Sequence, residues 1–171
     1  MSIFRFDEAM SRVANGAADP ASVLAARRSA VDSAFRDTIR RLGWRLLDGR
    51  TGPGELRRSR AFVLGVALWS RPDLGALEDL AGVKWIREKA IPVDVFDLDT
   101  CLTTADLAQI APGVPPITRT PLLAEYEGSR LLEFRVGPAV SAWCREVSAG
   151  DPREVRGNSS DRFEAIAHPI R

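Results

Sequence analysis

Few residues in this chain belong to the types that carry covalent or metal chemistry. The 171 residues include two cysteines, Cys101 and Cys144, and a single histidine, His168. One histidine and two distant cysteines do not have the spacing of a zinc site. A nucleophilic serine would need a histidine base, and His168 lies in a polar C-terminal segment. The residue types therefore argue against zinc chemistry and a serine triad, and we predict no metal and no cofactor.

The two cysteines have different sequence contexts. Cys101 follows the apolar segment Pro92–Leu98 and precedes a predicted helix, so one interpretation is a partly exposed thiol with a lowered pKa. The other is a buried or incidental cysteine, which is the commoner case. Cys144 adjoins Trp143 on a predicted helix and is expected in or near the core. Cys101 is thus the candidate reactive thiol.

Three aspartates lie along one predicted strand and its end. They are Asp94, Asp97 and Asp99, and one interpretation is a cation site at this strand end. No glycine-containing loop or following glutamate completes a calcium-binding pattern. We therefore favour a strand end in contact with solvent.

The composition is that of an ordinary globular protein. Hydrophobic residues make up 45% and charged residues 27%, and the formal net charge is +1. The best apolar run, 61–69, has the length of a strand and falls short of a membrane span. The N-terminus lacks the apolar stretch of a signal peptide. We expect a cytoplasmic, bacterial-type protein that does not enter a membrane.

Positive charge is concentrated near the N-terminus. Residues 27–60 contain ten arginines against four acidic residues. One interpretation is a nucleic-acid surface, although no aromatic residues alternate with the arginines to stack on bases. The other is an amphipathic helix that packs Phe35, Leu42 and Leu46 against the domain or a partner. We favour the second, and nucleic acid remains an alternative partner.

Residues 1–56 are expected to form a helical extension. Apolar residues recur at helical spacing from Leu24 to Leu46, which predicts a helix from Asp19 or Ser22 to about Asp48-Gly49. A shorter helix is predicted over Asp7–Ala14. Together they would make a helical hairpin whose second helix is basic.

Residues 57–148 are expected to form one α/β domain. The continuous apolar run from Ala61 to Leu68 predicts a strand buried on both faces. The order of elements that follows is β-α-β-α-β-β-α, with parallel strands joined through helices and a final hairpin at Gly128. Pro138 opens the last helix. Residues 149–171 are expected to be a polar C-terminal tail.

Three landmarks in this order resemble the thioredoxin family. Trp69-Ser70-Arg71-Pro72-Asp73 aligns with the family's Trp-Cys-Gly-Pro-Cys. Ile117–Leu123 resembles the segment with the family's cis-proline, which would be Pro121. Glu125–Gly128 and Val136-Gly137-Pro138 resemble its closing hairpin and the turn into its last helix. The resemblance covers about residues 60–148 and implies a three-layer thioredoxin-like sandwich with a mixed sheet.

The same alignment argues against disulfide chemistry. Exchange needs an activated thiolate and a resolving thiol, and those two positions hold Ser70 and Asp73. Leu64 occupies the position of the family's buried proton-carrying aspartate. We interpret Ser70 as a helix N-cap accepting backbone N–H groups, with Pro72 in the first turn and Asp73 near the positive end of the helix dipole.

What remains is a binding surface. By resemblance, a groove that holds extended peptides should include Trp69, Ser70, Arg71, Pro72, Asp73, Thr120 and Pro121. We predict a redox-inactive, non-enzymatic protein-binding or assembly module, a subunit or accessory factor of a larger complex. The alternatives are a single-cysteine thiol oxidoreductase or peroxidase acting through Cys101, and a nucleic-acid-associated protein using residues 27–60.

Overall fold

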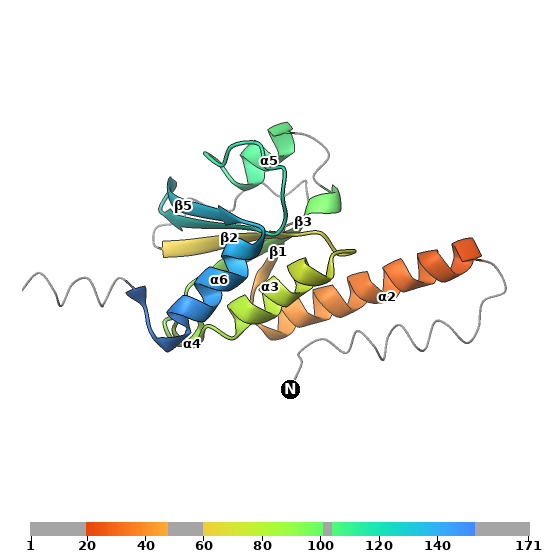
Figure 1. Cartoon of the computed structure of the whole chain (residues 1–171), viewed down its shortest axis with the longest axis horizontal. Helices are drawn as coiled ribbons and strands as arrows, with labels where there is room; N and C mark the ends of the chain where they lie inside the picture. The colour runs from red at the N-terminus through yellow and green to blue at the C-terminus, as the bar shows by residue number, and fades with distance from the viewer. Residues whose placement is uncertain (1–19, 48–59, 101–103, 153–171) are drawn as a thin grey trace, which may run out of the picture.

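A single mixed β-sheet organises the molecule. The computed structural model describes residues 20–47, 60–100 and 104–152. Their five strands lie in the order β1-β3-β2-β4-β5 (Figure 1). Three are parallel, namely β1 (Arg45–Leu47), β3 (Val93–Asp97) and β2 (Arg60–Val66). The antiparallel hairpin of β4 (Leu122–Glu127) and β5 (Arg130–Val136) completes the sheet, so the predicted α/β class and mixed sheet are confirmed.

Helices cover both faces of this sheet. On one face lie α2 (Pro20–Arg41), α3 (Arg71–Ala81), α4 (Lys84–Glu88) and α6 (Pro138–Glu146), which share one apolar core with the sheet. The other face carries α5 (Thr104–Ile110), whose Leu107 and Ile110 belong to a second core (Figure 1). Strand residues alternate between the two, as the pleat requires, so Phe62 and Leu64 enter the first core and Val63 the second.

Strand β2 is buried on both faces, as the apolar run predicts. Its Phe62, Val63 and Leu64 have no exposed surface. Gly65 lies opposite Phe96 of β3, and a Cβ atom at Gly65 would meet the Phe96 ring at 2.6 Å. Glycine at this position therefore lets the aromatic ring lie flat against the centre of the sheet.

Helix α2 ends earlier than the sequence predicts. The helical spacing extends through Leu46, but the helix stops at Arg41. Gly43 has a φ of +68°, the Gly43 N–H donates to the Arg40 carbonyl at 3.1 Å, and the Trp44 N–H donates to the Ile39 carbonyl at 3.1 Å. These are the two bonds of a Schellman C-cap, which satisfies the last carbonyls and turns the chain away from the helix axis.

The prediction that residues 42–48 continue the helix is therefore wrong. Arg45–Leu47 instead form β1, an edge strand paired with β3, and Leu47 is buried in the second core. The segment expected to be a separate helical extension thus supplies one strand of the sheet. The short helix predicted over Asp7–Ala14 lies outside the described residues.

The predicted C-terminal tail begins with a buried charge. Asp151 is 5% exposed and accepts hydrogen bonds from Arg60 at 2.7 Å and Lys89 at 2.8 Å. The Arg60 guanidinium also binds Glu125 at 2.9 Å and lies over the Trp85 ring, 4.5 Å from its centre. The chain is therefore tied to the sheet through Asp151, while 153–171 lie outside the described residues. None of the described helices combines the length and apolar character that crossing a membrane requires.

Candidate functional site

The candidate site lies where β2 leads into α3. After Val66 the chain keeps Ala67 and Leu68 buried and then exposes Trp69, whose side chain is 76% accessible. Ser70 has extended backbone angles (φ −97°, ψ 111°), and its carbonyl accepts the N–H groups of Asp73 at 3.1 Å and Leu74 at 3.2 Å. Helix α3 thus starts directly after the exposed tryptophan. Arg71 and Pro72 form its exposed first turn.

Asp73 is the buried centre of this site. It is 1% exposed and receives three donors. The Ser70 hydroxyl donates to Oδ1 at 2.6 Å and the Thr120 hydroxyl donates to the same oxygen at 3.1 Å. The Ala67 backbone N–H donates to Oδ2 at 2.8 Å. One carboxylate therefore connects the end of β2, the start of α3 and the segment before β4.

The role expected of Ser70 needs correction. Ser70 occupies the N-cap position, but its side chain makes no capping hydrogen bond to the helix. Its hydroxyl acts as a donor to Asp73 because that buried carboxylate offers a charge-assisted bond, which is stronger than one to a neutral group. The hydroxyl thus fixes the shape of the β2–α3 junction.

The peptide bond between Thr120 and Pro121 is cis, as the resemblance predicts. Pro121 is buried immediately before β4, and its carbonyl accepts the Gly137 N–H at 2.8 Å, at the turn from β5 into α6. Arg119 is exposed and Thr120 half-buried. Within the described part of the chain, the backbone groups of Arg119 and Thr120 form no backbone hydrogen bonds.

Trp69 is held by a residue that the sequence analysis did not place in the site. Its indole N–H donates to Asp99 Oδ1 at 3.0 Å. Asp99 lies in the 3-10 turn Leu98–Thr100 after β3, and its own N–H donates to Asp97 Oδ1 at 2.9 Å. Burial raises the pKa of the Asp97 carboxyl, and the bond from Asp99 opposes that shift. The sequence predicts that the strands now seen as β2 and β3 are parallel. The segments that follow two parallel neighbouring strands meet at one edge of the sheet, and this is the only signal that could have placed Asp99 near Trp69.

The three aspartates do not gather at one position. Asp94 is 3% exposed and forms a two-pronged ion pair with Arg45 of β1, with both contacts at 2.8 Å. The favoured expectation of a solvated strand end is therefore wrong for Asp94. No group of three metal-ligating side chains occurs among the described residues.

Cys144 lies in the core of the molecule. It is buried on α6, and burial raises the pKa of its thiol to about 12, so it remains a thiol at neutral pH. Cys101, the candidate reactive thiol, lies outside the described residues, and its reactivity stays a prediction.

The arginines of α2 are partly paired within the helix. Arg36 bonds Asp32 at 2.9 Å and Arg40 bonds Asp37 at 2.8 Å, while Phe35 and Ile39 are each 1% exposed in the first core. Of the residues expected on its apolar face, Phe35 is buried in the first core, whereas Leu42 and Leu46 lie beyond the end of α2.

No protein-family model matches the chain, and no curated protein matches it in sequence. The site must therefore be interpreted from its own geometry.

Proposed function

We propose that this chain is a redox-inactive, thioredoxin-like protein that binds extended segments of partner proteins at the end of β2, as a non-enzymatic assembly module. The observation that carries the proposal is Trp69, a large apolar side chain that is 76% exposed directly before α3, whose Asp73 binds both Ser70 and Thr120. Tryptophan is enriched among the residues that carry most of the binding energy at protein interfaces.

Two features support the thioredoxin-like fold. The cis bond lies at the position that the resemblance assigns, and α3 begins within the Trp69–Asp73 motif directly after a central parallel strand. The hairpin β4–β5 and the turn at Gly137 into α6 follow in the expected order.

The geometry suits an extended peptide. The backbone groups of Arg119 and Thr120, which have no backbone partner among the described residues, would offer hydrogen bonds to a peptide backbone, as an edge strand does to an added strand. Trp69 would then cover an apolar side chain of the peptide. Asp73 keeps the two halves of the groove in register, since it binds both Ser70 and Thr120.

The same contacts argue against catalysis at this position. Ser70 and Asp73 stand where a dithiol enzyme needs two sulfurs, and Asp73 already accepts three hydrogen bonds. Its role is therefore to organise the junction. The partner would be another protein, and we propose that this chain is a subunit or accessory factor of a larger complex.

The proposal can be tested with a random peptide library displayed on phage and selected on the full chain. Peptides that bind should lose at least tenfold in affinity for Trp69→Ala. They should bind Phe134→Ala normally, since Phe134 on β5 is the other exposed large apolar residue in the described part of the chain, at 39%. A variant with both cysteines changed to serine should also bind normally. Peptides that bind Trp69→Ala and the unchanged protein equally would refute the proposed groove.

A further inference from the structure

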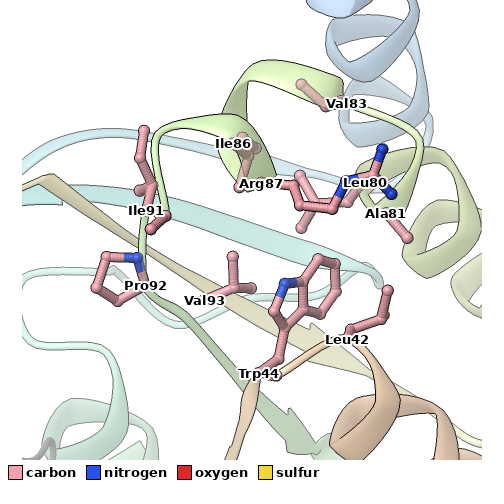
Figure 2. A pocket seen from close by; sticks show the side chains of 12 residues that line it. Leu42, Trp44, Leu80, Ala81, Val83, Ile86, Arg87, Ile91, Pro92 and Val93 are labelled. Atoms are coloured by element: carbon pink, nitrogen blue, oxygen red, sulfur yellow. The ribbon is translucent and has the colours of Figure 1, made fainter.

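A concave site lies between the C-terminal end of α2 and the α3–α4 region. Its volume is about 380 Å³, within the range of small-ligand sites. Figure 2 shows Trp44, Leu42 and Val93 on one side and Arg87, Leu80 and Ile86 on the opposite side. Apart from Arg87, its lining side chains are apolar, and they include Leu42, Trp44, Leu80, Ile86 and Val93.

This pocket is separate from the Trp69 groove. Val93 is the first residue of β3, whereas Trp69 follows the last residue of β2. Since β2 and β3 are parallel, the two sites lie at opposite ends of the sheet. A ligand in the pocket would therefore leave the Trp69 groove open.

Two hydrogen-bond donors border the pocket without an acceptor. Within the described part of the chain, neither the Trp44 indole N–H nor the Arg87 guanidinium forms a hydrogen bond or an ion pair. Arg87 is also the only charged residue in the lining, which contains no carboxylate. The pocket thus combines apolar walls with one unneutralised positive charge.

We infer that this pocket binds a small amphiphilic carboxylate, meaning a compound with an aliphatic or aromatic body and one carboxylate group. The apolar body would replace water against Leu80, Ile86 and Val93, which supplies most of the binding free energy. The ligand carboxylate would accept hydrogen bonds from the Arg87 guanidinium. A carboxylate oxygen that lies near the Trp44 indole N–H would also accept a hydrogen bond from it. A guanidinium suits this role because it stays charged and offers several donors in one plane.

The charge requirement makes the inference specific. A neutral ligand of the same shape would gain the apolar contacts but not the charge-assisted bond. A cationic ligand would meet Arg87 as a like charge. The expected order of affinity is therefore carboxylate, then alcohol, then amine.

The experiment uses the full-length protein and decanoate at concentrations below micelle formation. The chain has four tryptophans, so a 1H–15N spectrum reports on four indole N–H groups, and Trp44→Phe identifies the signal of Trp44. Decanoate should shift the Trp44 signal in a saturable way and leave that of Trp69 unchanged. Decanol should bind more weakly, and decylamine weakest.

Matched variants on α4 test the role of charge. Arg87→Gln should weaken decanoate binding about tenfold, as loss of a charge-assisted hydrogen bond predicts, and should not change decanol binding. Lys84→Gln removes the same charge from another exposed position of α4, outside the pocket lining, and should leave decanoate binding unchanged.

Several results would overturn the inference. One is a Trp44 signal that decanoate does not shift, as expected if a segment of this chain or a second copy fills the pocket. Others are equal shifts of all four indole signals, which indicate a detergent effect, and equal weakening by Arg87→Gln and Lys84→Gln. Sedimentation velocity in the same samples identifies the second-copy case.

Discussion

At the scale of single residues, Asp73 decides the shape of the candidate site. The sequence predicts that Asp73 lies at the start of a helix but does not identify its partners, because a serine hydroxyl can donate or accept. Burial of the carboxylate settles the direction, since a buried charge must receive donors. Its three donors come from residues 67, 70 and 120, and the contact with Thr120 joins positions 47 residues apart.

Removing this carboxylate should destabilise the protein. Asp73→Ala leaves the buried Ala67 N–H and two hydroxyls without their acceptor, so we expect a loss of about 2 kcal/mol or more in the free energy of unfolding. Urea denaturation followed by circular dichroism measures it. The control Asp37→Ala breaks only an exposed pair within α2 and should barely move the midpoint. Equal midpoints for the two variants would contradict the role given to Asp73.

Cys144 should make stability depend on alkaline pH. Its thiol pKa rises from the ordinary 9.0 to about 12 on folding, so the folded chain keeps a proton that the unfolded chain loses. This contribution is complete below pH 9 and is lost as the pH rises from 9 toward 12. Between pH 9 and 11, the free energy of unfolding should fall faster than in Cys144→Ala, by up to about 1.4 kcal/mol per pH unit. Parallel pH dependences of the two proteins would exclude this coupling.

At the scale of elements, hydrophobic periodicity predicted the longer strands and helices but not the shortest strand. The run 61–68 predicted a doubly buried strand, and β3, the β4–β5 hairpin and helices α3, α5 and α6 follow in the order expected from the sequence, whereas the short helix α4 does not appear in that order. β1 was missed because a strand of three residues is too short to show alternation, and Leu42 and Leu46 continue the helical spacing of α2. Gly43 marks the end of the helix in the sequence, but a glycine alone does not reveal the Schellman hydrogen bonds that end the helix there.

Two glycines give opposite predictions for the same substitution. Gly65→Ala places a methyl group 2.6 Å from the Phe96 ring and should cost about 1–3 kcal/mol of stability. Gly75→Ala, within α3, meets no atom within 4 Å and should stabilise the protein by about 0.5–1 kcal/mol. Thermal and urea unfolding of both variants measure these effects. A stable Gly65→Ala would show that β3 can move away from β2 without loss.

At the scale of the whole molecule, the sheet and the N-terminal region form one packed unit. Three apolar residues of the N-terminal region are each at most 2% exposed. Phe35 and Ile39 of α2 belong to the first core, and Leu47 of β1 belongs to the second. Full burial of side chains of this size contributes roughly 2 kcal/mol each, which together is comparable with the net stability of many domains.

A fragment that begins at residue 57 should therefore fail to fold. It lacks β1 and the three buried side chains of the N-terminal region, so we expect no dispersed NMR spectrum and no cooperative thermal transition. A fragment that begins at Pro20 keeps every contact described above and serves as the comparison. A well-folded 57–171 fragment would instead support the domain boundary at residues 56–57 that the sequence predicts.

The salt-bridge cluster around Asp151 also determines how the molecule can be immobilised. Arg60 opens β2 and holds Asp151, so the chain leaves the described domain at the opposite pole of that strand from Trp69. A biotin or affinity tag on a chain that ends at Pro152 would attach the protein to a sensor surface through that pole. The tryptophan would then point into the flowing sample, which makes C-terminal capture the favourable orientation for measuring partners, and N-terminal capture a useful contrast.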